Sequence, residues 1–182
     1  NLLTGTRHFV LKCPQHRGPA VEVRKEIIRP STTVYIEPKT GLPAKLVVTA
    51  ETVRHLADQG NAMLADGLSI PVPLEHQPDA RPLTQSERAA HNLRHNAGWV
   101  TKFEVDKDNH LIASLDIADK DIASKLPGTI KFTSPWINSF VDGKGKKWDG
   151  VISHVALTTR PRIVKQEPFA PSMAAALSLV TN

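Results

Sequence analysis

Apolar and polar positions alternate over several short stretches of the chain, which is the pattern of half-buried β-strands. The stretches that show it are residues 7–12, 21–28, 32–36, 98–105, 111–117, 130–141 and 150–158. The last four form two pairs, and a short polar loop joins the members of each pair. We therefore expect two β-hairpins, one around residues 106–109 and one around a loop rich in Gly and Lys.

Apolar residues at helical spacing replace this alternation over residues 50–65. Val53 and Leu56 fall on the same helix face, and Thr49 is a suitable N-cap for a helix that begins after it. Gly60 weakens the helix because glycine loses more backbone freedom than other residues when it is ordered. The pattern still predicts a helix over the whole range.

Three other segments are less regular. Residues 119–126 predict a helix that ends at Pro127, and the polar residues 78–96 predict a loop with a short helix over 84–93. Residues 70–76 are apolar and extended, but their two prolines argue against an interior strand.

Together these elements predict a mainly β domain with flanking helices, of the α+β class. Such a mixture is expected when a closed or strongly curved antiparallel sheet is wrapped by helices. The regular pattern decays after Pro161. We therefore expect one domain over residues 1–165 and a flexible C-terminal tail over residues 166–182.

Composition excludes several classes of protein. No apolar run approaches the roughly 18 residues that a membrane-spanning helix needs. Cys13 is the only cysteine, so no internal disulfide forms, and a reducing compartment is expected. The chain begins at Asn1 without an initiator Met or a signal-peptide pattern, so we expect a trimmed or processed chain, and nothing in the sequence suggests secretion.

The net charge of +5 is spread along the chain, and aromatic residues make up only 5% of it. A nucleic-acid surface usually has a denser basic stripe with aromatic residues between the charges. Nucleic acid is therefore not an expected partner.

Other motifs of known chemistry are absent from the sequence. It contains no glycine-rich phosphate loop and no GxSxG motif, which argues against P-loop nucleotide hydrolysis and the α/β-hydrolase route. His91 and His95 are four residues apart, as zinc ligands on a helix are, but the HExxH pattern is absent. We expect no metal and no cofactor, and we retain hydrolysis through a metal at His91 and His95 as the third hypothesis.

A different set of residues has the parts that acyl transfer requires. Ser134 stands between a strand-like segment and a proline, and His76 ends a stiff, proline-restricted stretch. His154 lies inside an apolar strand, where an imidazole needs a partner. Arg160 and Arg162 follow it closely. A nucleophile, a base, an orienting imidazole and a cation are the components of such a site.

Four short segments occur in an order that resembles the prohead, or capsid-maturation, proteases of tailed phages. They are PLEH at 73–76, AGWV at 97–100, TSP at 133–135 and ALTTRP at 156–161. The resemblance covers roughly residues 65–165. These phage enzymes are related to the herpesvirus assemblins, in which a Ser-His-His triad is built on a closed β-barrel flanked by helices. The resemblance therefore implies an assemblin-like barrel.

The resemblance implies a role for each candidate residue. Ser134 would be the nucleophile, His76 the general base and His154 the member that orients the base. Arg160, or else Arg162, would help stabilise the oxyanion, directly or through a water.

The third member of the triad has acidic alternatives, because some phage relatives use a carboxylate. In this chain the alternatives are Glu75, Asp79 and Asp116. A neutral histidine stabilises the imidazolium of the base less than an aspartate does. A Ser-His-His triad would therefore give a slow enzyme.

The leading hypothesis is a serine endopeptidase that cleaves scaffold and major capsid proteins, and itself, during capsid maturation. It would act inside the immature capsid in the host cytoplasm, encoded by a phage or a prophage, and a homodimer is left open. The tail would be a link to a removed scaffold region, and residues 171–178 contain small residues after which self-cleavage is implied. The alternative is a non-catalytic scaffold or capsid-assembly module with the same fold.

Overall fold

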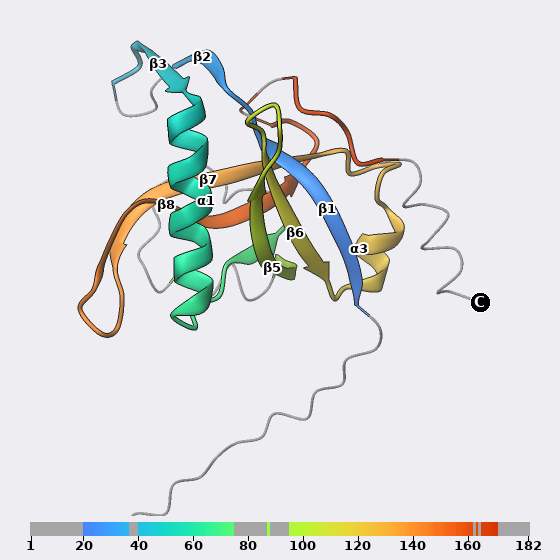
Figure 1. The fold of residues 1–182 in the computed structure, drawn as a ribbon. Helices are drawn as coiled ribbons and strands as arrows, with labels where there is room; N and C mark the ends of the chain where they lie inside the picture. The colour runs from blue at the N-terminus through green and yellow to red at the C-terminus, as the bar shows by residue number, and fades with distance from the viewer. Residues whose placement is uncertain are drawn as a thin grey trace, which may run out of the picture.

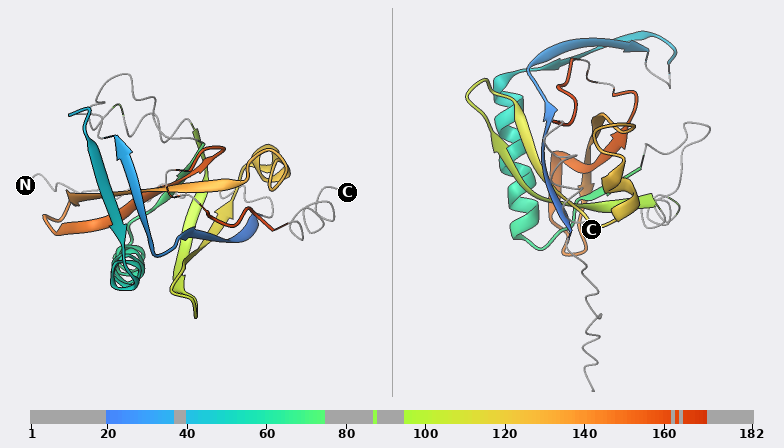
Figure 2. Two further views of the ribbon diagram at one scale, coloured as in Figure 1. Left: turned by 90° about the horizontal axis from the view of Figure 1, so that it is seen from above. Right: turned by 90° about the vertical axis from the view of Figure 1, so that its right-hand side faces the viewer.

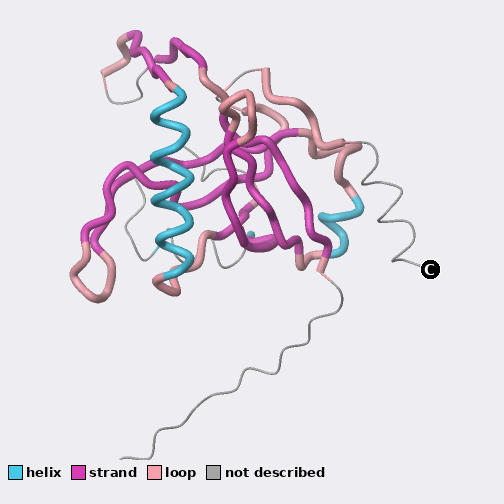
Figure 3. Tube along the Cα trace, viewed as in Figure 1, coloured by secondary structure: helices cyan, strands magenta, loops and turns pink. Residues whose placement is uncertain are grey.

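The computed structural model describes residues 20–36, 40–74, 87, 95–161, 163 and 165–170. The strands are β1 (Val21–Ile28), β2 (Ser31–Ile36), β3 (Pro43–Val48), β4 (Pro71–Pro73), β5 (Asn96–Val105), β6 (Leu111–Ile117), β7 (Phe132–Val141) and β8 (Lys147–Thr158). The helices are α1 (Ala50–Ala65) and α3 (Lys120–Ser124). Strands dominate the described chain, as Figure 3 shows, so the expected α+β class is confirmed.

The strands form three antiparallel sheets. A four-stranded sheet has the order β1-β6-β5-β4, and β2-β3 and β7-β8 are separate two-stranded ribbons. Figures 1 and 2 show the long β7–β8 ribbon crossing the four-stranded sheet, with α1 beside both. The four-stranded sheet and the β7–β8 ribbon therefore form two β layers, and α1 packs at one side of both.

No sheet closes into a barrel within the described strands, so the expected closed barrel is not found there. Closure requires ladder hydrogen bonds between the two edge strands of one sheet. In this sheet β1 and β4 stay at opposite edges, and Leu74, just after β4, forms a parallel bridge with Leu157 of β8. The edge at β4 thus meets the second β layer.

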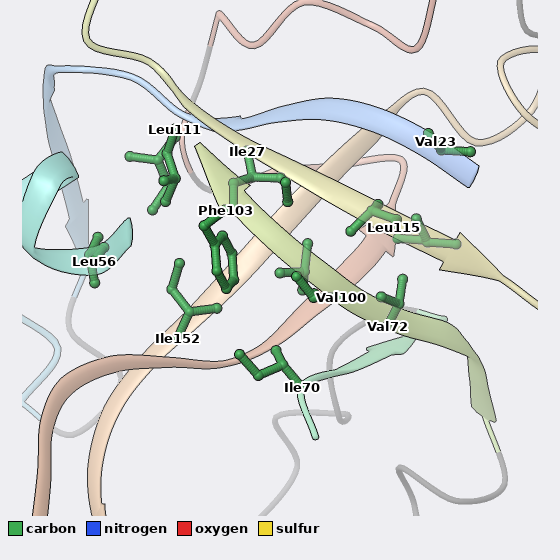
Figure 4. Packing of buried hydrophobic residues seen from close by; sticks show 14 of the residues in the cluster. Val23, Ile27, Leu56, Ile70, Val72, Val100, Phe103, Leu111, Leu115 and Ile152 are labelled. Carbon is green, nitrogen blue, oxygen red and sulfur yellow. The ribbon is translucent and has the colours of Figure 1, made fainter. Parts of the chain in front are cut away.

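The core lies between the four-stranded sheet, α1 and the β7–β8 ribbon, where Figure 4 shows apolar side chains pointing into one shared space. The labelled residues are Val23, Ile27, Leu56, Ile70, Val72, Val100, Phe103, Leu111, Leu115 and Ile152. Full burial of such a side chain contributes roughly 1.5–3 kcal/mol. This core holds the ribbon, and any site on it, in a fixed position.

Helix α1 has the predicted bounds and the predicted cap. Thr49 accepts a hydrogen bond from the backbone N–H of Thr52, and the Thr52 side chain accepts one from the N–H of Thr49. Gly60 is buried against the ring of Phe103, which explains a glycine in the middle of a helix. The next residue, Asn61, binds the backbone N–H and C=O of Phe103, each at 2.9 Å.

Several strand predictions agree with the structure. Strand β1 has the predicted bounds, and both hairpins, β5–β6 and β7–β8, form. The prolines of β4 lie at the edge of the sheet, where a missing N–H breaks no ladder bond.

Three elements differ from expectation. Strand β3, which pairs with β2, was not predicted, because half of the ribbon faces solvent and its apolar pattern is weak. Helix α3 is shorter than predicted, and Asp119 is its N-cap. Strand β8 begins at Lys147, three residues before the predicted strand, because the turn around Asp142 is tight. The predicted strand at 7–12 and helix at 84–93 lie outside the described residues.

The start of the predicted tail packs against the domain. Gln166 and Phe169 are buried, and the backbone N–H of Phe169 donates to the carbonyl of Lys131, just before β7. Residues 171–182 lie outside the described part of the chain. None of the described helices combines the length and the hydropathy needed to cross a membrane.

Candidate active site on the β7–β8 ribbon

Ser134 lies in the middle of β7 and is paired with Ala156 of β8. Its side chain is buried, with 2% of the residue exposed. Alternate residues of a strand point to the same face, so Ser134 shares a face with Trp136. Among the described residues, no hydrogen bond involves the Ser134 hydroxyl.

His154 lies on β8 directly opposite Trp136. Paired residues of an antiparallel ladder share a face, so His154 belongs to the same face as Ser134. The two residues are diagonal neighbours, and the Cα atoms of such neighbours are about 7–8 Å apart. No hydrogen bond joins these two side chains directly. The structure therefore brings two of the predicted site residues onto one face of the ribbon, with His154 two positions from Ala156, the partner of Ser134.

The His154 ring stacks on the indole of Trp136. The ring centroids are 6.0 Å apart and the ring planes differ by 9°. Trp136 remains 39% exposed, and His154 is half-buried. Aromatic residues at this separation with near-parallel planes adopt the offset-stacked arrangement.

A β-bulge adjoins this pair. Trp136 pairs with His154, but Ile137 pairs with Ile152, so Ser153 is an extra residue on β8. The Ser153 hydroxyl donates to the backbone carbonyl of Trp136 at 3.3 Å. Bulges change the direction of neighbouring side chains and are frequent next to active sites.

The predicted base, His76, lies outside the described residues, as do Glu75 and Asp79. The last described residue before them is Leu74, which bridges Leu157 of β8 and donates its N–H to the carbonyl of His95 at 2.8 Å. Leu157 is next to Ala156, the partner of Ser134. Leu74, two residues before position 76, therefore lies beside the part of β8 that pairs with Ser134.

Arg160 lies on the exposed bend that follows β8, where its backbone N–H donates to the Thr158 hydroxyl at 3.1 Å. Thr158 pairs with Phe132, two positions before Ser134. No hydrogen bond or ion pair among the described residues joins the Arg160 guanidinium to Ser134. Arg162, the second predicted oxyanion residue, lies outside the described residues.

Asp116, an alternative third member, belongs to the other sheet. It lies on β6 between Glu22 of β1 and Trp99 of β5, whereas its neighbours Leu115 and Ile117 are buried in the core. No hydrogen bond or ion pair in the described chain connects Asp116 with Ser134 or His154. The ribbon face thus groups Ser134 with His154 and not with this carboxylate.

The segment around Gln166 was not anticipated as part of the site. The Gln166 side chain accepts from the backbone N–H of Thr133 at 3.4 Å and donates to the carbonyl of Thr133 at 2.9 Å. It also donates to the carbonyl of Ile27 on β1 at 3.2 Å. A glutamine in a segment without apolar periodicity is a weak sequence signal for burial. Gln166 was therefore assigned to the predicted tail.

Lys25 is a second buried polar residue in this region. Its ammonium lies 5.4 Å from the centroid of the Phe169 ring and donates to the backbone carbonyl of Glu167. Burial lowers the pKa of Lys25 from 10.5 to about 8, although the carboxylates of Glu26 and Glu167 oppose the shift. Lys25 and Gln166 together attach the segment after β8 to β1 and β7.

The metal hypothesis gains no support in the described chain. His95 is exposed, and His91 lies outside the described residues. Within the described ranges, no three His, Cys, Asp or Glu side chains are grouped so that they could hold a metal ion.

Comparisons of the chain with protein-family models, with curated proteins and with solved structures found no match.

Proposed function

We propose that this protein is a serine endopeptidase in which Ser134 is the nucleophile, His76 the general base and His154 the residue that orients the base. The observation that supports it most directly is the shared face of Ser134 and His154 on the β7–β8 ribbon. Two candidates found independently in the sequence, twenty residues apart, are diagonal neighbours in space.

A triad requires a third side chain between Ser134 and His154, since no hydrogen bond joins the two directly. The spacing of diagonal neighbours, about 7–8 Å between Cα atoms, is compatible with an imidazole that makes a hydrogen bond of about 2.6–3.2 Å to each of them. In the proposal that ring is His76, and Leu74 beside Leu157 is the point from which the chain reaches it.

The chemistry follows from the roles of the three side chains. His76 accepts the proton of Ser134 as its oxygen attacks the scissile carbonyl, and it then protonates the leaving amine. Water hydrolyses the acyl-enzyme by the same route in reverse order. Arg160 or Arg162 stabilises the oxyanion, and His154 fixes the tautomer of His76.

The substrate assignment depends on the resemblance of the four sequence segments to prohead proteases. We propose that the protease cleaves scaffold and major capsid proteins inside the immature capsid, and its own tail after small residues. From the same resemblance we propose that the two β layers belong to a strongly curved, assemblin-like barrel. A homodimer is also part of the proposal.

One observation favours the alternative of a non-catalytic assembly module. Ser134 is 2% exposed, and a peptide bond cannot reach its hydroxyl unless the covering residues move. A scaffold that retains the fold without catalysis would tolerate such burial permanently. An enzyme requires an accessible state, so its rate depends on how often the site opens.

Labelling with a fluorophosphonate probe distinguishes the two functions, because the probe reacts with activated serines. We expect stoichiometric labelling of the wild-type chain and none in Ser134→Ala. Ser114→Ala is the matched control, since Ser114 is also buried in a strand but lies on β6. Labelling of Ser134→Ala at the wild-type rate would reject Ser134 as the nucleophile, and an unreactive wild-type chain would favour the assembly module.

A further inference from the structure

The stacked pair of Trp136 and His154 has a consequence for the direction in which His154 can bind. An imidazole forms hydrogen bonds at its ring edge and in the plane of the ring. A ring lying at 9° to the indole therefore directs both of its nitrogens parallel to the indole surface. The orientation of the Trp136 side chain consequently limits where a partner of His154 can lie.

Trp136 is itself held in place by the ladder. It lies directly opposite His154, and the bulged Ser153 binds its backbone carbonyl at 3.3 Å. Pro135, the preceding residue, has a fixed φ angle. The backbone that carries the indole is therefore held in place next to His154.

The exposure of Trp136 is consistent with a role at the site. Its 39% exposed side chain adds less to the core than a fully buried tryptophan would. Trp99 on β5 is exposed to a similar extent, 42%, on the sheet face that carries Asp116. The two residues form a matched pair of partly exposed tryptophans, of which one contacts a site residue.

We propose that Trp136 is a positioning residue that sets the ring plane of His154. This inference depends on the proposed protease function. A hydrogen bond between His154 and the base requires the His154 ring to point toward the base. Displacement of a catalytic group by about 1 Å can reduce the rate by as much as about 10²-fold. The rate of the proposed reaction should therefore depend more on an aromatic face at position 136 than on the size of the side chain there.

Three variants separate the aromatic face from bulk and from general stability. Trp136→Phe keeps a smaller face, Trp136→Leu removes the face, and Trp99→Leu is the matched control at the distant tryptophan. Trp136→Val, which suits a strand, replaces the leucine variant if that variant does not fold. Each variant is first compared with the wild type by its urea midpoint.

The rate of fluorophosphonate labelling and the NMR shifts of the His154 ring protons are then measured across pH 5–9. We expect labelling within about threefold of wild type in Trp136→Phe and at least tenfold slower in Trp136→Leu, at an unchanged urea midpoint. The ring-current shift of the His154 protons should fall in Trp136→Leu and stay in Trp99→Leu.

The outcomes separate this inference from the proposed function. Equal labelling of wild type and folded Trp136→Leu would overturn the positioning role and leave the protease intact. A ring-current shift that persists in Trp136→Leu would overturn it as well. A wild-type chain that does not label would reject the protease, and the positioning role with it.

Discussion

The side-chain amide of Gln166 binds Thr133 as a neighbouring β-strand would, accepting from its N–H and donating to its C=O. Asn61 does the same for Phe103 on β5. In both places no strand of the described chain pairs on one side, and an amide side chain completes the strand edge there. An unpaired edge of this kind is otherwise a site for unwanted pairing with other chains.

Replacing Gln166 with Leu should strongly destabilise the protein. The change removes the partner of Thr133 N–H and C=O and of the Ile27 carbonyl, while the side-chain volume stays similar. Each buried backbone group without a partner destabilises by about 1–3 kcal/mol, and the change leaves three of them, so we expect a total loss of about 3 kcal/mol or more. Urea unfolding measures it. The control is Lys131→Gln, which is exposed and two positions before Thr133, and which should change stability by less than about 0.5 kcal/mol.

The buried Lys25 should make stability rise with pH in the alkaline range. Its pKa is about 8 in the folded protein and 10.5 in an unfolded chain. Between these values the unfolded chain binds the extra proton, so the free energy of unfolding increases as the pH rises. We expect an increase of about 1–3 kcal/mol after allowance for solvent screening.

Lys25→Met isolates this contribution from those of other titrating groups. The variant keeps an unbranched apolar side chain beside Phe169 but cannot be protonated. Urea unfolding of both proteins at several values from pH 7 to pH 10 should show the wild type gaining stability relative to the variant. Parallel curves would mean that Lys25 titrates normally.

Gly60→Ala should destabilise the protein although alanine favours helices. A Cβ at position 60 would lie 2.5 Å from two ring carbons of Phe103. Overpacking of this kind costs about 1–3 kcal/mol, which exceeds the helix-propensity gain of about 1 kcal/mol. Thermal unfolding should show a lower Tm for Gly60→Ala. The double variant Gly60→Ala with Phe103→Leu should lose less than the sum of the two single changes, because the smaller side chain relieves the clash.

Gly98→Ala should be more damaging, for a reason that side-chain movement cannot remedy. A Cβ at position 98 would lie 2.0 Å from the backbone oxygen of Asp116. The β5–β6 ladder itself would have to separate, so we expect a loss of about 3 kcal/mol or more, or an insoluble chain. The neighbouring change Trp99→Phe, on an exposed side chain, is the control for solubility. A folded Gly98→Ala with wild-type stability would contradict the register of this pair.

Gly98 also shows how a motif and a contact are related. It belongs to one of the four segments on which the resemblance to prohead proteases depends, and the sequence alone offered no reason for a glycine there. The structure supplies a packing reason, which is the close approach of β5 to β6. This segment therefore supports the fold more directly than it supports a catalytic role.

Elements with local causes could be predicted from the order of amino acids alone. Helix α1 follows from a 3.6-residue apolar period and a capping threonine within one turn. The two hairpins follow from alternation on either side of short polar turns. The weakly alternating β3 was missed, because the exposed side chain of Val47 makes its pattern hard to distinguish from a loop.

Which of these elements meet, and which residues share a face, depends on contacts between distant parts of the chain. The β7–β8 ladder shifts register in two places, and its unbroken part from Phe132 to Trp136 leaves Ser134 and His154 on one face of the ribbon. The burial of Lys25 and Gln166 depends on a segment that shows no period of its own. Strand pairing and edge completion join residues that are far apart in the chain, so no local pattern of apolar and polar positions can specify them.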